Sequence, residues 1–316
     1  MRNPTYHYKI YLYYFFKIHS ETNYPNERRG HMKAEKNQSR KIFSLLDTDI
    51  ICKHKDDALP QFDEILFHNH DGYEIFLFLS GNADYYIESS GKKLERGDLI
   101  LSPVYSFHCS RADARIKYER IFINIRENKL SELSSNGVDL SSCFNNSSTT
   151  DINLIRLNEA EIDEFIRLSD SLEKSLDESS YGSDLLSDSL LIQIMIMVNR
   201  MFLKNESLPY TGIMPDIIRN VINYINEHTS DNITVSGLGE MYHHNPDYLS
   251  RIFKSFTGIP LQHFILIKKI TLAQHLLRKG HTPLSACYNS GFNNYSNFSR
   301  SFSKIVGTSP KKYQKR

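Results

Sequence analysis

The sequence predicts an α+β protein in which a β-barrel or β-sandwich is followed by helices and then by an all-α C-terminal domain. Three observations indicate this order. Short apolar runs separated by turn residues fill residues 42–125, two helix-like segments follow within residues 151–204, and a motif of 14 residues occurs twice after residue 244. With 40% hydrophobic and 24% charged residues among 316, the chain can bury two ordinary cores. Two domains are therefore expected.

The β-region is placed at residues 41–130. Its apolar runs are short, and turn signals that contain glycine separate them at intervals that suit a barrel or sandwich. These signals are Asp71-Gly72, Ser80-Gly81, Ser90-Gly91 and Arg96-Gly97-Asp98. The polar, low-complexity stretch at residues 134–150 is expected to be a loop.

Two helices are expected within residues 151–204. The first, residues 158–176, is acidic with one apolar side, and the second, residues 183–203, is apolar on most of its circumference. The second helix must be covered, either by the first helix and the barrel or by a second copy of the chain. We expect a second copy, which makes residues 151–204 a dimerisation segment and the chain a homodimer. The apolar residues behind this expectation are Leu185, Leu190, Leu191, Ile194, Met195, Val198 and Phe202. The polar residues 205–214 are expected to form a linker.

The C-terminal domain, residues 215–316, is expected to contain two helix-turn-helix units because one motif occurs in it twice. NPDYLSRIFKSFTG, residues 245–258, recurs 49 residues later as NYSNFSRSFSKIVG. Each copy has one apolar helix face and one polar face, so each would bury one side and display the other. In the second copy Ser301 replaces the apolar Ile252, and looser packing of that helix is expected.

Helix start and stop signals frame both copies. Asn245 and Asn294 are expected to be N-caps, and Gly258 is expected to end the first displayed helix. Helices are also expected at residues 216–228, 235–242 and 260–279, and the pattern begins again at Pro283.

Charge is segregated along the chain, although the net charge is only +1. From Tyr248 to the end there are 12 Lys or Arg and no Asp or Glu, whereas residues 41–210 contain 17 Lys or Arg and 29 Asp or Glu. A C-terminal block without carboxylates suits a polyanionic partner, because Lys, Arg and helix N-termini make phosphate contacts. The plainer alternative is a basic surface that is merely well solvated.

The cysteines and the N-terminal residues indicate a cytoplasmic protein. None of the four cysteines has C-x-x-C spacing, so neither a zinc knuckle nor a disulfide framework is predicted. The aromatic run YHYKIYLYYFFKIH is too short for a membrane span and predicts neither a signal peptide nor an anchor. Residues 1–40 are interpreted as an extension. The codons for ERRGHM could resemble a bacterial ribosome-binding site, so two alternatives stay open: translation from Met32, or a real, loosely attached extension.

The residues from Asp216 onward resemble the double helix-turn-helix domain of AraC/XylS-type transcriptional regulators. The matching features follow the family's order: YLSRIFK before a glycine, A-x-x-L-L in the long helix, the pair Gly291-Phe292, FSRSF, and GTSPKKY. Three residues depart from those common in the family, and we expect them to affect the stability of the domain more than its activity. They are Gly239, Lys269 and Cys287.

The displayed helix faces suit DNA reading. A helix that enters the major groove needs small or polar side chains near its N-terminus and long donors that reach base edges. The residues that meet this requirement, and that the resemblance implies for base readout, are Asp247, Ser250, Arg251, Ser296, Asn297, Ser299 and Arg300. Phosphate contacts are expected from Lys254, Lys304, Lys311 and Lys312. The alternative is that the two arginines are solvated or contact only phosphate.

The segment HNHDGYEIFLFLSG in the β-region contains candidate ligands. His68 and His70 are two residues apart and so point to one face of a strand, and a turn at Asp71-Gly72 is expected to bring Glu74 toward them. His108 ends a later run, GDLILSPVYSFH. Two histidines, a glutamate and a distant histidine can bind a divalent metal.

The same segments resemble the two cupin motifs, which implies a cupin-like barrel, although Phe62, Tyr105 and Ala112 replace residues of a full cupin. In AraC-type regulators such a barrel usually senses a small molecule, often a sugar. Three interpretations stay open: an effector pocket without metal, a metal-containing sensor or structural site, and plain core histidines. The effector-binding candidates are His68, His70, Tyr73, Glu74 and His108, and the metal-ligand candidates are His68, His70, Glu74 and His108.

The sequence thus predicts a transcriptional regulator that is not an enzyme. Its expected partners are promoter DNA, a small-molecule effector, a second copy of the chain and, for an activator, RNA polymerase, but no membrane. One alternative is a metal-dependent cupin enzyme, an oxygenase or isomerase, with a basic appendage. The missing cupin residues and the complete DNA-binding half argue against it. The other alternative is a DNA binder that needs no effector.

Overall fold

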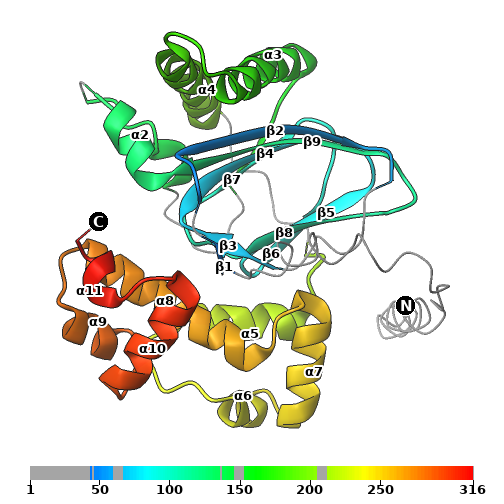
Figure 1. Cartoon of the computed structure of the whole chain (residues 1–316). Helices are drawn as coiled ribbons and strands as arrows, with labels where there is room; N and C mark the ends of the chain where they lie inside the picture. Colours follow the sequence, from blue (N-terminus) through cyan, green and yellow to red (C-terminus); the bar gives the residue numbers. More distant parts are fainter. Residues whose placement is uncertain are drawn as a thin grey trace, which may run out of the picture. The chain divides into compact units, whose positions relative to one another are not determined.

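A computed structural model describes residues 43–44, 46–59, 67–135, 137–145, 153–204 and 212–315 (Figure 1). Strands come first along these residues and helices fill the C-terminal part, so the predicted α+β fold, with a β-region followed by an all-α domain, is confirmed. The predicted extension at residues 1–40 and most of the predicted linker lie outside the described residues. Residues 41–316 belong to one compact unit.

The larger sheet has five antiparallel strands in the order β10-β7-β4-β9-β2. They are β2 (Ile50–Asp57), β4 (Gly72–Ser80), β7 (Asp98–Ser102), β9 (Tyr118–Arg126) and β10 (Asn153–Arg156). The central strand β4 is buried on both faces. Its Ile75 and Leu77 belong to a core shared with helices, whereas Phe76 and Phe78 belong to a core shared with the second sheet. This explains why its sequence is a continuous apolar run.

The second sheet has three strands in the order β6-β5-β8, and a short parallel pair joins β1 to β3. The strands are β1 (Phe43–Ser44), β3 (Asn69–His70), β5 (Ala83–Ile87), β6 (Ser90–Lys93) and β8 (His108–Ala112). The two larger sheets share an apolar core, as in an open cupin-like barrel. Strand pairing does not close the barrel among the described residues.

Two predicted turns are wrong in their positions or roles. Ser90-Gly91 lies within β6, and the turn comes earlier because Glu88 takes a left-handed conformation, with φ of 49°, and accepts a hydrogen bond from the Phe107 amide (2.9 Å). Asp71-Gly72 is a bend where the chain passes from β3 to β4, which do not pair. Gly72 is needed there, since a Cβ would lie 2.7 Å from the Ile125 carbonyl oxygen.

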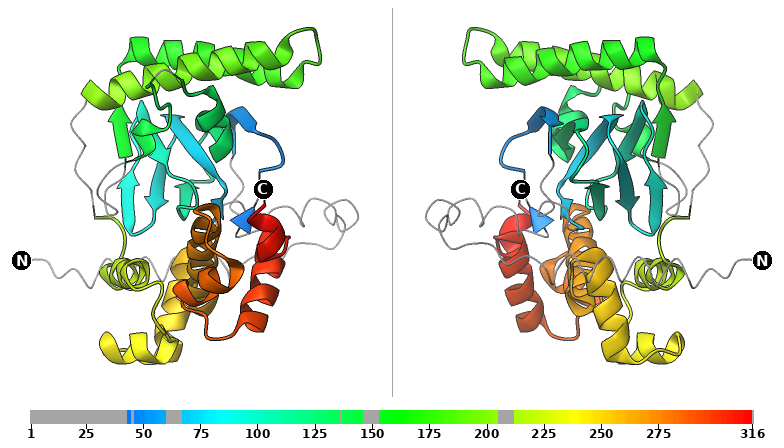
Figure 2. Two further views of the ribbon diagram at one scale, coloured as in Figure 1. Left: turned by 90° about the vertical axis from the view of Figure 1, so that its left-hand side faces the viewer. Right: turned by 90° about the vertical axis from the view of Figure 1, so that its right-hand side faces the viewer.

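Helices cover the outer face of the larger sheet (Figures 1 and 2). They are α3 (Glu159–Asp177) and α4 (Ser183–Lys204), with α2 (Glu127–Leu133) and the short 3₁₀ helix η4 (Ser142–Phe144) nearby. Asn158 caps α3 in a reciprocal capping box with Glu161. Residues Phe165 and Leu172 of α3 are fully buried against this sheet and α4.

Most of the α4 residues that were expected to need a second subunit for cover are already covered within the chain. Of the seven apolar residues behind this expectation, five are buried within the chain itself, because the sheet and α3 cover more of the helix than the sequence pattern suggests. These five are Leu190, Leu191, Ile194, Met195 and Val198. Leu185 stays 76% exposed, and Leu186 and Leu203 are also exposed. By length and composition alone α4 could cross a membrane, but here it packs on a sheet.

The C-terminal helices follow the predicted order. They are α5 (Asp216–Glu227), α6 (Val235–Met241), α7 (Pro246–Thr257), α8 (Leu261–Arg278), α9 (Pro283–Asn289), α10 (Tyr295–Val306) and α11 (Pro310–Tyr313). α8 contacts α5, α7, α9, α10 and α11, so it is the central helix of this domain. Two apolar cores flank it: one with α5, α6 and α7, the other with α9, α10 and α11.

Two departures from the family pattern have structural roles. A Cβ at Gly239 would lie 2.7 Å from the His244 carbonyl oxygen, so the tight turn between α6 and α7 requires glycine. The Lys269 side chain is buried in α8 and donates to the carbonyl oxygens of Asp231 and Gly291, both at 2.8 Å. It thereby joins the loop before α6 to the turn before α10.

Candidate functional site

Helix α7 is held so that one face is free. The Asn245 side chain caps it by accepting hydrogen bonds from the amides of Asp247 (2.9 Å) and Tyr248 (3.2 Å), and Gly258 ends it in a left-handed conformation. The buried face consists of Leu249, Ile252 and Phe253. On the opposite side, Asp247, Arg251 and Lys254 are exposed and Ser250 is half-buried. The DNA-reading candidates of the first copy therefore lie together on one accessible face.

Helix α10 repeats this design. Asn294 caps it by accepting from the Asn297 amide (2.9 Å), and Gly307 ends it in a left-handed conformation. The buried face consists of Phe298, Phe302 and Val306, at most 2% exposed. Val306 thus adds a third buried apolar residue to this face, and the expectation of looser packing stays a prediction.

The displayed face of α10 also carries its candidates together. Ser296, Asn297, Arg300 and Lys304 are exposed, and Ser299 is half-buried. The Arg300 guanidinium donates to the Asn297 side-chain oxygen (2.6 Å), one turn earlier. This bond holds the guanidinium beside Asn297 on the exposed face of α10.

The remaining phosphate-contact candidates lie on α11. Lys311 and Lys312 are exposed, and Ser309 caps this short helix through the Lys312 amide (3.3 Å). All four lysine candidates are thus accessible to a polyanion.

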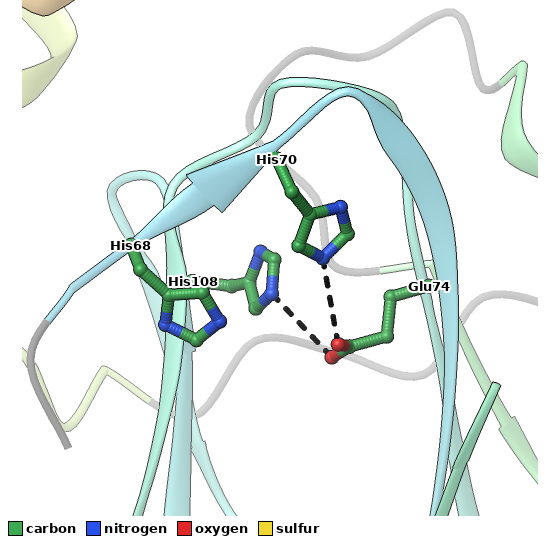
Figure 3. A group of neighbouring side chains, drawn as sticks. All are labelled: His68, His70, Glu74 and His108. Atoms are coloured by element: carbon green, nitrogen blue, oxygen red, sulfur yellow. Dashed lines mark ion pairs between the residues drawn. The ribbon is translucent and has the colours of Figure 1, made fainter. Parts of the chain in front are cut away.

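The histidine–glutamate cluster, defined as His68, His70, Glu74 and His108, is assembled inside the barrel as expected (Figure 3). One ligand atom of each residue lies within 4.8 Å of the others. His70 Nε2 is 3.6 Å from one Glu74 carboxylate oxygen, and His108 Nε2 is 3.5 Å from the other. The residues come from β4, β8, β3 and the position just before β3, so the bend at Asp71-Gly72 brings them together.

Neighbouring groups orient the cluster. His108 Nδ1 is 2.9 Å from the Ser106 carbonyl oxygen, so this nitrogen donates and Nε2 faces the other ligands. The Tyr85 hydroxyl donates to Glu74 (3.0 Å) and lies 3.2 Å from Ser102 Oγ. Such outer contacts are typical of sites that bind a metal or a polar ligand. Sequence reasoning missed Tyr85 and Ser106, because only the three-dimensional pairing of strands brings them to the cluster.

The charges of the cluster are coupled. Burial works to raise the pKa of Glu74, but His108 and His70 hold that pKa well below its ordinary value. Burial works to lower the pKa of His108, and Glu74 raises it above its ordinary value instead. Both ring nitrogens of His70 and Nε2 of His108 are buried without a hydrogen-bond partner. Buried nitrogens of this kind suit an additional ligand.

Tyr73 does not join the cluster. It precedes Glu74 on β4 and therefore points to the opposite face, where its ring stacks on Phe144 with centroids 4.4 Å apart. There it lines an open hollow of about 580 Å³ with Glu127 and several serines. If Tyr73 contacts an effector, that effector would lie in this hollow and not in the barrel interior.

The comparisons with known proteins agree with a DNA-binding domain at the C-terminus. Residues 238–316 match the family model for a helix-turn-helix domain. The chain is 26% identical to the probable transcriptional regulator LumQ of Photobacterium leiognathi over 249 residues. This aligned region covers 78% of this chain and 91% of that protein.

A second relative and a solved structure give partial matches. The arabinose operon regulatory protein of Escherichia coli (strain K12) is 31% identical over 134 residues, which is 42% of this chain and 44% of that protein. The structure of ToxT from Vibrio cholerae is similar at 16% identity and a TM-score of 0.36, over 84% of this chain and 98% of that one.

Proposed function

Because this chain is an AraC-type transcriptional regulator, we propose that it reads an asymmetric promoter site with α7 and α10 and that a small molecule bound in the barrel controls this binding. One observation carries the first part. Two helices with matching caps each display Ser and Arg beside one another, and α8 connects them within a block of the chain that has no carboxylate after Asp247. Such a pair could enter consecutive segments of the major groove.

The displayed side chains divide by chemistry. Arg251 and Arg300 can each donate two hydrogen bonds to a guanine edge, and the small Ser250 and Ser299 let the backbone approach. Asp247, Ser296 and Asn297 complete the base-reading set. The four exposed lysines, Lys254, Lys304, Lys311 and Lys312, neutralise phosphate and fix the register without specifying sequence.

Selection from a random DNA pool tests the proposal. The full chain should enrich duplexes with two preferred base clusters about one helical turn, 10 to 10.5 base pairs, apart. Enrichment without sequence preference would contradict base readout. A map of the sites bound in the genome would then identify the target genes and separate activation, which needs RNA polymerase as a partner, from repression.

The proposed sensor is the barrel interior around the cluster. Its ring nitrogens and carboxylate could accept and donate hydrogen bonds to the hydroxyl groups of a sugar. A panel of aldopentoses and aldohexoses should include one that raises the melting temperature of the wild type but not of His70→Ala. If no sugar raises the melting temperature and none changes the DNA affinity, the sugar-sensor proposal is contradicted. A DNA binder that needs no effector is then favoured.

A divalent metal ion is the second candidate ligand, because three ring nitrogens in the cluster are buried without a hydrogen-bond partner, and two of them face the Glu74 carboxylate. The donor set of three histidines and a glutamate fits zinc, iron, manganese or nickel, and His108 is oriented by a carbonyl as metal-bound histidines are. The ion would supply a positive charge that replaces a proton shared by these residues. Purified wild type should contain about one equivalent of metal and a His68→Ala, His70→Ala variant almost none. Less than about a tenth of an equivalent in the wild type would remove this candidate.

We also propose a cytoplasmic homodimer. The apolar surface that α4 leaves exposed, at Leu185, Leu186 and Leu203, supports pairing with a second copy. Sedimentation at tens of micromolar should give a dimer, and Leu185→Glu should shift it toward monomer. A wild-type monomer at that concentration would contradict the proposal.

A further inference from the structure

The cluster and the C-terminal helical domain contact the same short loop, Pro103–Phe107, which connects β7 to β8. Within this loop the Tyr105 amide donates to the His70 carbonyl (2.9 Å), the Ser106 carbonyl binds the His108 ring, and His108 begins β8 directly afterwards. A ligand that moves His70 or His108 must therefore move this loop. The loop also contacts the C-terminal helices, as do Phe67 and Arg111, which donate to the carbonyl oxygens of Thr257 and Phe256 at the end of α7.

The first contact, called here the tyrosine contact, joins the loop to α8 and α11. The hydroxyl groups of Tyr105 and Tyr313 are 2.8 Å apart and buried. The Arg278 guanidinium lies over both rings, 5.2 Å from the centroid of Tyr105 and 5.7 Å from that of Tyr313. Arg278 also forms an ion pair with Glu127, at the start of α2.

The second contact, called here the glutamate contact, joins the loop to α5 and α8. One Glu88 oxygen accepts from the Phe107 amide, and the other accepts from Lys268 of α8 and from Asn226 of α5. The Phe107 ring is fully buried and packs on Phe264 of α8, with centroids 4.6 Å apart. The side chains of Lys268 and Glu88 keep only 11% and 18% of their exposure.

Two features indicate that these contacts oppose DNA binding. Glu88 and Glu127 of the acidic β-region neutralise two of the 12 cations in a block that otherwise has no carboxylate. Docking also holds the excess negative charge of residues 41–210 against the domain that must approach phosphate.

We propose that the tyrosine and glutamate contacts form an autoinhibitory clasp: while they are made, the chain binds DNA weakly, and ligand binding at the histidine–glutamate cluster opens them through the loop Pro103–Phe107. This inference rests on the proposed sensor and DNA-reading functions. It adds the residues that connect them and the direction of the effect. The ligand is proposed to bind the open form more tightly than the closed form. In the open form the loop that bonds to His70 and His108 is free to adjust to the ligand.

The first experiment measures the affinity of full-length variants for the duplex that the wild type selects from a random pool. Tyr105→Phe removes one hydroxyl without changing charge and leaves the bond between Gln274 and Tyr313 in place. It should bind about 3- to 10-fold more tightly than the wild type. Glu88→Gln should bind about 5- to 50-fold more tightly.

Glu164→Gln is the matched control, because it removes one carboxylate from an exposed pair with Arg167 on α3 and changes the net charge equally. It should change the affinity less than about 2-fold. Equal affinities in wild type, Tyr105→Phe and Glu88→Gln, or weaker binding in both variants, would overturn the clasp. If the wild type selects no sequence at all, the proposed function fails instead.

The second experiment tests the connection to the cluster without knowing the ligand. Glu74→Gln should change the DNA affinity by at least about 3-fold in the wild-type background and leave it unchanged, within about 1.5-fold, in a background that combines Tyr105→Phe with Glu88→Gln. The non-additivity is the result that a purely structural role of Glu74 would not produce. An equal effect in both backgrounds, or no effect in either, would refute transmission through this loop.

Amide hydrogen exchange of the wild-type protein tests the same proposal without any substitution, so a folding defect of a variant cannot affect the result. Adding the selected duplex should speed amide exchange in the peptide that contains residues 103–107, because DNA binding favours the open clasp by reciprocity. Slower or unchanged exchange in this peptide would contradict autoinhibition.

Discussion

Replacing Lys269 by Met should loosen the connection between the two helix-turn-helix units. The Lys269 ammonium is buried in the middle of α8 and bonds two carbonyl oxygens, those of Asp231 and Gly291, each at 2.8 Å. Met has a similar volume but no donor, so both carbonyls would lose a partner in a buried place.

The size of the loss follows from two opposing effects. Each buried carbonyl that loses its partner costs about 1 to 3 kcal/mol. Against this, the substitution removes a buried charge, and burial already lowers the pKa of Lys269 below its ordinary value. A net loss of about 2 kcal/mol in the free energy of unfolding is therefore expected. Lys269→Arg keeps donors at this position and should lose less than half as much.

Urea unfolding followed by far-ultraviolet circular dichroism is the suitable assay, because the chain has no Trp and its C-terminal domain is helical. The midpoint for the helical transition should fall by about 0.7 to 1 M in Lys269→Met. DNA affinity should fall as well, since the relative positions of α7 and α10 are no longer fixed from both sides of α8. A midpoint within about 0.2 M of the wild type would refute the role assigned to this lysine.

The remaining predictions concern caps and a surface pair. Asn245→Ala and Asn294→Ala should each cost about 1 kcal/mol of stability, measured by urea unfolding. The loss for Asn245→Ala should be at least as large as the other, because Asn245 caps two amides and Asn294 caps one. Glu173 accepts from the His54 amide and from Lys53; burial works to raise its pKa, but these bonds lower it. Because the folded pKa lies below the unfolded one, the stability that Glu173→Gln loses at pH 7 should disappear as the pH falls through the folded pKa. A loss that persists in acid would show that packing and not charge is responsible.

Local rules made the helices predictable from the sequence. Asn245 and Asn294 signal their caps by residue type and position, and each helix ends at a glycine that takes the left-handed conformation. The histidine–glutamate cluster was also predictable, because alternation along a strand places His68 and His70 on one face.

Features that depend on distant contacts were not predictable. The turn at Glu88 is held by Phe107, which pairs with it only after β8 has formed. The buried side of α4 depends on a sheet whose strand order the sequence does not state. Tyr105 and Tyr313, whose hydroxyls meet, are 208 residues apart in the sequence.

The central claim is that both displayed helices read bases, and selection of preferred DNA by two variants tests it most directly. Arg251→Ala and Arg300→Ala should each lose about 1 to 3 kcal/mol at the selected site, and each should relax the preference at one base cluster only. Lys254→Ala should weaken binding to all sequences alike and lower the salt dependence by about one contact. If both arginine variants instead behave like Lys254→Ala, the assignment of base readout is wrong; if only Arg300→Ala does, α10 positions the domain on phosphates.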